Sequence, residues 1–204
     1  MVKVNSLVLG PLQTNCYVVH EENSTSCVVV DPAHAPEKIL EFTAARGLTI
    51  EAILLTHGHF DHVGAVERIV GTTGCALWMC KSDWSQFPNP VTAYFYPIAN
   101  CDFCEVNFCE DGETIRSGGL TFQVIATPGH TPGSVCYRCG GVIFSGDTLF
   151  AGGCGRTDLP GGNPGQLMHS LGRLAAMEAD LTVYPGHGES TTLAAEKQYN
   201  PYMR

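Results

Sequence analysis

Four side chains that can bind a metal ion lie within residues 57–62, His-Gly-His-Phe-Asp-His. The apolar run 50–55 before them predicts a short buried strand, and in an extended chain leaving it residues 57, 59 and 61 point to the same side. Residue 62 begins the next predicted helix, and the turn can direct its side chain to the same centre. Three imidazoles and a carboxylate converging there would be costly to bury unpaired. The segment therefore predicts a site for a divalent cation, and its donors suit zinc, iron or manganese.

Three later segments place a polar residue just past an apolar run. His130 follows the run 124–126, Asp147 follows 142–144, and His187 follows 182–184. Neighbouring glycines permit tight turns, and functional groups collect on such strand-end loops. With the first motif these residues bring the donors to five histidines and two aspartates, enough for two metal ions that each keep one position for water. The expected ligand set is His57, His59, Asp61, His62, His130, Asp147 and His187.

The composition restricts the classes of partner. A chain of 204 residues with 44% hydrophobic and 15% charged residues is globular, and we expect one domain over residues 1–204. The net charge of −9 is unsuited to holding a phosphate backbone, so we expect a small-molecule substrate and no nucleic acid. No apolar run is long enough to span a bilayer, and no apolar signal region follows Lys3. We expect a cytoplasmic protein without a membrane partner; the sequence does not indicate its oligomeric state.

Ten cysteines include two Cys-x-x-Cys pairs, Cys101/Cys104 and Cys136/Cys139, with Cys109 close behind the first pair. One interpretation is a structural zinc or redox site. The other is a set of small buried thiols. We favour buried thiols, because neither pair has the second pair that would complete four zinc ligands at standard spacing, and because a chain of this size needs no disulfides.

Hydrophobic patterning predicts many strands with helices between them. Strands are expected at 2–9, 15–20, 27–30, 50–55, 75–80, 120–126, 134–137, 142–144 and 181–184, and helices at 36–47, 63–70, 165–178 and 191–199. Residues 83–111 combine prolines and aromatics without a period, and we expect an irregular excursion over the surface that could act as a lid. This order of elements favours an α+β protein in which two sheets lie between helical layers.

The order His-x-His-x-Asp-His, then His130, Asp147 and His187, resembles the metallo-β-lactamase-fold hydrolase superfamily. Residues 146–150, Gly-Asp-Thr-Leu-Phe, followed by 155–162, Gly-Arg-Thr-Asp-Leu-Pro-Gly-Gly, are similar to its glyoxalase II-like (hydroxyacylglutathione hydrolase-like) branch, and 185–188, Pro-Gly-His-Gly, matches the short bacterial members. The resemblance implies a four-layer αββα sandwich. It also implies one metal on His57, His59 and His130, and a second on Asp61, His62 and His187, with Asp147 bridging the two.

The resemblance further implies a binuclear hydrolase in which metal-bound hydroxide attacks an acyl carbon, with zinc the first choice of metal and iron or manganese the alternatives. Asp61 would be catalytic, holding a metal and orienting the nucleophile. A thiolate leaves with little acid help, which favours small thioesters such as S-lactoylglutathione. Asp31 would orient a ligand imidazole, unless it is only a turn residue. Arg156 would contact substrate, unless it pairs with Asp158.

Three alternatives remain open at this stage. A mononuclear-iron sulfur (persulfide) dioxygenase shares the fold, and so do lactone, ester or phosphodiester hydrolases. A binding module with a vestigial site is the third alternative, although every expected ligand is present. The bridging position of Asp147 argues against β-lactamase chemistry. His20, His34 and His169 lie outside the motifs, and we expect them to be surface or structural residues.

Overall fold

Two six-stranded sheets form the centre of the computed structural model, which describes residues 1–84, 94–95, 97 and 104–204. The first sheet has the order β1-β2-β3-β4-β5-β6, in which β1 to β3 are antiparallel and β3 to β6 are parallel. Its strands are β1 Val2–Leu9, β2 Thr14–Glu21, β3 Ser26–Val30, β4 Thr49–Leu54, β5 Ala76–Cys80 and β6 Val106–Cys109.

The second sheet has the order β14-β13-β10-β9-β8-β7, with one parallel pair, β10 and β13. Its strands are β7 Thr114–Ser117, β8 Leu120–Ala126, β9 Val135–Cys139, β10 Val142–Gly146, β13 Thr182–Pro185 and β14 Thr191–Thr192. A small ribbon of β11 Leu149–Phe150 and β12 Gly153–Cys154 leaves the end of β10.

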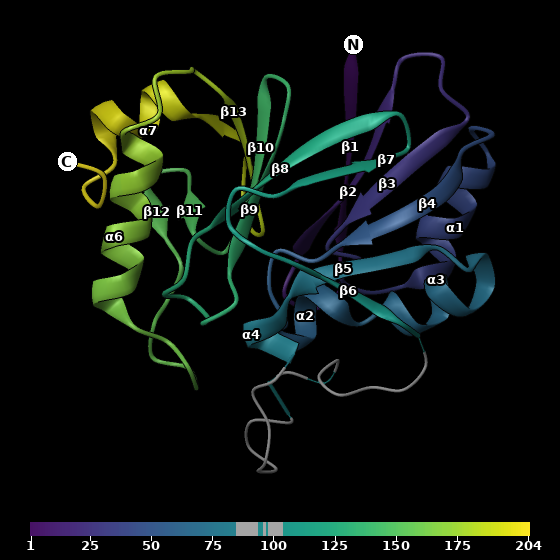
Figure 1. Cartoon of the computed structure of the whole chain (residues 1–204), viewed down its shortest axis with the longest axis horizontal. Helices are drawn as coiled ribbons and strands as arrows, with labels where there is room; N and C mark the ends of the chain where they lie inside the picture. The colour runs from purple at the N-terminus through teal and green to yellow at the C-terminus, as the bar shows by residue number, and fades with distance from the viewer. Residues whose placement is uncertain (85–93, 96, 98–103) are drawn as a thin grey trace.

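Helices cover the outer face of each sheet (Figure 1). On the first sheet lie α1 Pro36–Ala44 and α3 Val66–Thr73, and on the second lie α6 Pro164–Ala175 and α7 Leu193–Tyr199. Two short helices, α2 Phe60–Val63 and α4 Lys81–Trp84, lie at one end of the sandwich. These layers confirm the predicted αββα architecture.

Side chains of the central strands are buried on both faces, which explains why their sequences are apolar runs without alternation. In β3, Cys27 and Val29 pack toward the helices of the first sheet, whereas Val28 and Val30 pack into the space between the sheets. All four are fully buried. A third cluster packs α6 and α7 against the second sheet. Successive side chains of one strand thus contribute to two different cores.

Two buried tyrosines join the sheets by hydrogen bonds in opposite directions. Tyr137 of β9 donates its hydroxyl hydrogen to the carbonyl of Leu55 (2.9 Å), just past β4. Tyr17 of β2 donates to the carbonyl of Pro185 at the end of β13 (2.6 Å), and the Asn15 amide donates to the same carbonyl (3.0 Å). The two accepting carbonyls lie two residues before predicted ligand histidines, so these bonds position the loops of the candidate site.

Two sequence-based expectations were wrong. The helix expected at 63–70 is divided into α2 and α3, because the Ala65 amide donates to the carbonyl of Pro32 (2.9 Å) and brings the chain against the loop after β3. At Gly64 a Cβ atom would lie 2.5 Å from the Ala33 carbonyl oxygen, so this close approach requires glycine.

The prediction of an irregular surface excursion over 83–111 was wrong at both ends of that range. Asp83 is fully buried in α4, and β6 adds a strand to the first sheet at Val106–Cys109. The four-residue strand is too short to show a period, and tertiary pairing with β5 defines it. The expected lid falls largely on 85–93, 96 and 98–103, which lie outside the described residues.

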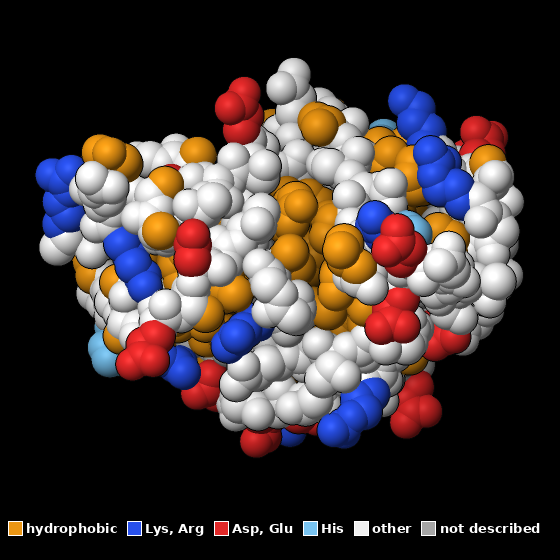
Figure 2. Space-filling model, turned by 90° about the horizontal axis from the view of Figure 1, so that it is seen from above, with side chains coloured by type: hydrophobic (Ala, Val, Ile, Leu, Met, Phe, Trp, Pro, Cys, Tyr) orange, Lys and Arg blue, Asp and Glu red, His pale blue; other side chains and the backbone are white. Residues whose placement is uncertain are grey.

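On the face seen from above, hydrophobic side chains gather near the centre and charged side chains lie mostly toward the margin (Figure 2). The short helices α2 and α4 lie toward the opposite side of the molecule (Figure 1). Among the described residues, none of the helices combines the length and the apolar character needed to cross a membrane.

Replacing Tyr137 with Phe tests the contribution of the bonds between the sheets. Tyr137→Phe removes a buried donor and deprives the Leu55 carbonyl of a partner, so we expect the free energy of unfolding to fall by about 1–2 kcal/mol. Urea denaturation of the metal-free protein measures the change. Tyr199→Phe, at a side chain 66% exposed, is the control and should unfold like the parent; equal stability of both variants would contradict the assignment.

Candidate metal centre

All seven predicted ligands lie in segments that follow strands of the two sheets. His57 and His59 are in the loop after β4, and α2 carries Asp61 and His62. The other three follow β8, β10 and β13 of the second sheet: His130, Asp147 and His187. The candidate site therefore lies where the two sheets meet, and neither sheet alone contains all of its ligands.

The donor atoms form three overlapping groups, within each of which all atoms lie within 4.8 Å of one another. One group is His57, His59 and His130, which is the set expected for the first metal. Another is Asp61, His62 and His187, the set expected for the second metal. The third, His57, His62 and Asp147, lies between them, so the Asp147 carboxylate is close to both. The structure thus brings the seven residues together, and metal binding by them stays a prediction.

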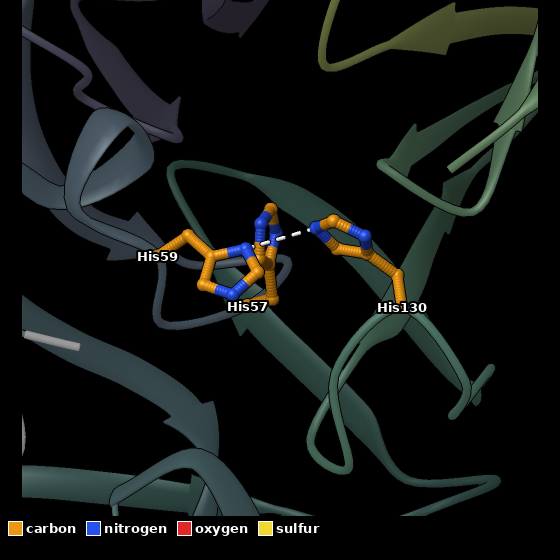
Figure 3. A group of neighbouring side chains, drawn as sticks. All are labelled: His57, His59 and His130. Atoms are coloured by element: carbon orange, nitrogen blue, oxygen red, sulfur yellow. Dashed lines mark hydrogen bonds between the residues drawn. The ribbon is translucent and has the colours of Figure 1, made fainter. Parts of the chain in front are cut away.

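Three imidazole rings converge in the first group (Figure 3). Nδ1 of His59 lies 2.9 Å from Nε2 of His130, and the rings of His57 and His59 meet edge to face with centroids 4.8 Å apart. Two nitrogens bound to one tetrahedral zinc at its usual bond length lie about 3.3 Å apart. A small outward movement of these rings would therefore accommodate an ion between them.

The chemistry of the donors fits a cation. Nε2 of His57, Nε2 of His62 and Oδ1 of Asp147 are buried and have no hydrogen-bond partner among the described residues. Such atoms cost free energy when they are buried without a partner. Nε2 of His62 lies 3.4 Å from Oδ1 of Asp147. A metal ion among them would satisfy all three.

Asp31 orients two of the ligand imidazoles, as the sequence predicted for one. Its Oδ2 lies 3.0 Å from Nδ1 of His62 and accepts a hydrogen bond from the Thr56 hydroxyl (2.6 Å). The Thr56 oxygen in turn lies 3.1 Å from Nδ1 of His57. Contacts at Nδ1 leave Nε2 of each ring directed at the centre, the arrangement that fixes a metal-binding tautomer. The alternative, that Asp31 is only a turn residue, is wrong.

Backbone carbonyls orient two further rings in the same way. Nδ1 of His130 lies 2.7 Å from the carbonyl oxygen of Arg156, and Nδ1 of His187 lies 3.2 Å from that of Leu12. His59 is different, because its Nδ1 faces the other ligands. Four of the five rings thus point Nε2 into the site. The sequence could not show which nitrogen of each ring faces the other ligands.

Burial and the crowding of histidines keep the first group neutral. Desolvation, with a smaller contribution from the neighbouring imidazoles, lowers the pKa of His57 far below its usual value and that of His59 to about 3. Burial also lowers the pKa of His62, but Asp147 and Asp31 outweigh it and raise that pKa well above its usual value. Burial raises the pKa of Asp61, yet the contact with His187 and the charge of His62 bring it below the usual value. The first group and Asp61 are thus in the forms that bind metal, whereas a metal ion at His62 would have to displace a proton.

Asp83 is a positioning residue that the sequence analysis missed. Its side chain is fully buried and accepts hydrogen bonds from the Gly58 amide (2.8 Å), the Thr131 hydroxyl (2.8 Å) and the Gly133 amide (2.6 Å). Burial raises its pKa to about 6, although these three donors oppose the shift. The carboxylate thereby ties the loop of His57 and His59 to the loop of His130. Residue 83 lies where the sequence pattern is confused, so no local signal could have identified it.

Arg156 does not extend a free charge into the site. Its guanidinium forms a bidentate pair with the Asp158 carboxylate, with both N–O distances 2.6 Å. The hydrogen bond and charge of Arg156 lower the pKa of Asp158 to about 2. The alternative interpretation of Arg156, a loop ion pair, is therefore the one that the structure supports, while its carbonyl positions His130.

The remaining histidines and the cysteines of the described residues belong to none of the three donor groups, although Cys154 lines the same cavity as the ligands. His34 and His169 are exposed, and the partly buried His20 contacts Asn5. The nine cysteines of the described residues are free thiols, and Cys101 lies outside those residues. Cys136 and Cys139 belong to different hydrophobic clusters on opposite faces of the second sheet, which contradicts a site formed by that pair.

A cavity of about 590 Å³ opens above the ligands, a size typical of small-molecule sites. Five of the candidate ligands line it, Asp61 and Asp147 among them. Tyr94 and Phe95 also line the cavity, whereas Trp78 and Trp84 pack against the cores.

Comparison with known proteins identifies relatives over nearly the whole chain. A family model described as the metallo-β-lactamase superfamily matches residues 9–187. The hydroxyacylglutathione hydrolase GloC of Haemophilus influenzae is 30% identical over 99% of this chain and 98% of its own length. The crystal structure of the BLEG-1 B3 metallo-β-lactamase has a TM-score of 0.88, 34% identity, and covers 100% of this chain and 99% of its own. The crystal structure of TTHA1623 in a di-iron-bound form has a TM-score of 0.84 and 39% identity, and the match covers 98% of this chain and 100% of TTHA1623.

Removing single ligands tests the division into two metal positions. His59→Ala and His187→Ala should each reduce the bound metal from about two ions per chain to about one, because each removes a ligand from a different group. Asp147→Ala should weaken both positions. Metal content after dialysis, measured by mass spectrometry, checks this. His169→Ala, at an exposed histidine in α6, is the matched control; its loss of metal would contradict the assignment.

Asp83→Ala tests the bridge between the ligand loops. We expect affinity for the ion held by His57, His59 and His130 to fall about 10–100-fold, the usual effect of losing a residue that orients ligands. Competition with a chromophoric chelator measures the affinity. Thr43→Ala, a buried change in the outer helix α1, controls for a general loss of stability and should keep the parental affinity. Equal affinities in both variants would refute the positioning role.

Proposed function

This chain belongs to the metallo-β-lactamase superfamily, and on that basis we propose that it is a binuclear metal-dependent hydrolase of small acyl thioesters. The observation that carries the proposal is the convergence of five imidazoles and two carboxylates at one site, with buried nitrogen and oxygen atoms that lack hydrogen-bond partners among the described residues. Zinc is the metal we propose first, and iron or manganese suit the same donors.

Two bound divalent ions would lower the pKa of a shared water and stabilise negative charge on the carbonyl oxygen of the substrate. Asp61 is placed to orient the attacking water. Its carboxylate lines the cavity, accepts a hydrogen bond from Thr14 (3.0 Å) and lies 3.2 Å from Nε2 of His187. The lowered pKa keeps it ionised, so it can accept a hydrogen from the nucleophile.

A thioester fits the site because its leaving group needs little help. A thiol has an ordinary pKa near 8.5, so a thiolate can depart without first receiving a proton. The reaction adds water across the C–S bond and yields a carboxylic acid and a thiol. The likeness to the hydroxyacylglutathione hydrolase of Haemophilus influenzae supports S-lactoylglutathione as a trial substrate, with a small, uncharged thioester beside it.

The similarity to the BLEG-1 B3 metallo-β-lactamase makes β-lactam hydrolysis the second candidate function. In an amide the leaving nitrogen is a much poorer leaving group than a thiolate and requires protonation. A chromogenic cephalosporin assayed beside the thioesters distinguishes the two functions.

Metal removal tests the proposed function. Protein purified without chelator should hold about two ions per chain and hydrolyse thioesters. Chelation followed by dialysis should lower kcat/KM at least about 100-fold, and added zinc should restore it. A single iron per chain, no thioester hydrolysis and oxygen uptake with a persulfide would instead identify a dioxygenase. Faster turnover of the cephalosporin than of any thioester would identify a lactamase.

Asp61→Asn tests the role of the carboxylate in orienting water. We expect kcat to fall about 10²–10⁴-fold, the usual effect of removing a group that accepts a proton. Metal content must be measured on the same sample, because loss of an ion would also abolish turnover. Glu67→Gln, at an exposed carboxylate in α3, is the control and should retain parental kcat. Retention of kcat by Asp61→Asn would exclude the proposed role.

A further inference from the structure

The wall of the candidate cavity is mainly apolar. Leu12, Phe60, Phe150 and Leu159 line it, and the Phe60 ring contacts that of Tyr94 with centroids 5.6 Å apart. The Leu12 side chain is 52% exposed, although it lies beside the ligands. Apolar surface that stays exposed next to a reactive centre is well suited to cover an apolar part of a substrate.

The apolar surface continues beyond the main cavity. A second cavity of about 170 Å³ shares Leu12, Phe60 and Asp61 with the first. It extends past Leu9, Pro11 and Ala33, and Thr14 and His34 also line it. A short acyl group such as lactoyl would fill only a small part of this space. The two cavities together provide room for a longer acyl chain that starts at the ligands and passes Phe60.

Among the described residues that line the cavity, Arg156 is the only lysine or arginine. The Asp158 carboxylate accepts hydrogen bonds from its Nε and Nη2, both at 2.6 Å, and offsets its charge. A glutathione thioester carries two carboxylates on its thiol arm. A carboxylate that approaches Arg156 would also approach the negative charge of Asp158, which weakens the attraction.

We propose, on the basis of the proposed thioester hydrolysis, that this site selects thioesters with an apolar acyl group and an uncharged thiol arm. Asp158 acts as a specificity-determining residue, because its carboxylate offsets the charge of the Arg156 guanidinium and repels carboxylates of the substrate. The acyl chain lies along Leu12 and Phe60, with its carbonyl at the ligands. Hydrolysis breaks the C–S bond, forms a C–O bond with water, and releases a fatty or arylalkanoic acid and a neutral thiol.

A homologous series of substrates tests the apolar wall. With N-acetylcysteamine as a constant neutral thiol, kcat/KM should rise about threefold for each methylene added from acetyl to hexanoyl. Leu12→Ser should flatten this dependence, because it makes the wall polar. Val8→Ser, at an exposed apolar residue outside both cavities, is the matched control and should retain the dependence. No dependence on chain length in the parent would overturn the proposal.

A comparison of thiol arms tests Asp158. The parent should cleave S-lactoyl-N-acetylcysteamine with a kcat/KM at least about threefold above that for S-lactoylglutathione. Asp158→Asn removes the compensating charge beside Arg156 and should shift the ratio of the two at least fivefold toward the glutathione thioester, and Asp158→Asn combined with Arg156→Gln should reverse the shift. Equal values in the parent, or a preference of the parent for the glutathione thioester, would overturn the proposal.

The two proposals fail in different ways. Cleavage of every thioester at similar rates, without dependence on chain length or thiol charge, overturns the selectivity alone and leaves thioester hydrolysis in place. No cleavage of any thioester by protein holding two metals overturns the proposed function, and the selectivity with it.

Discussion

Five imidazoles and two carboxylates share one small buried volume, and much of the structure serves to hold them there. Without a cation, buried atoms such as Nε2 of His57 and Oδ1 of Asp147 find no partner among the described residues. The cost of leaving them so is acceptable only if the site gains a ligand. The ligands come from both sheets, so the αββα sandwich must be assembled before the donor set is complete.

Two buried aspartates hold the loops that carry the ligands in position. Asp31 connects Thr56 with His62 behind one side of the site, and Asp83 joins the two loops that carry the first group of histidines. Between the sheets, Tyr17 and Tyr137 fix the segments from which those loops leave. Each of these polar groups is buried with its partners in place, the condition under which a buried network makes a site rigid.

The proposed chemistry follows from the contrast between the floor and the wall of the cavity. The floor gathers charged and imidazole donors, while the wall presents Leu12, Phe60 and Phe150. A thiolate leaves without receiving a proton, so thioester hydrolysis requires no proton donor on the cavity wall. The side chains of the wall can therefore serve to bind and select the substrate. Arg156 is the single lysine or arginine among the described lining residues, and its pairing with Asp158 offsets its charge there.

The sequence alone predicted the seven candidate ligands, the core strands and the layered fold, because apolar runs indicate burial and polar residues just past them indicate the strand ends where sites form. Only the tertiary structure decided that Asp83 bridges residues 25 and 50 positions away, that Asp31 serves two histidines, and that Arg156 is paired. Those outcomes depend on how separate loops meet across the two sheets. Local periodicity carries no information about such tertiary contacts. For the same reason it did not predict the break between α2 and α3 at Gly64 or the short strand at 106–109.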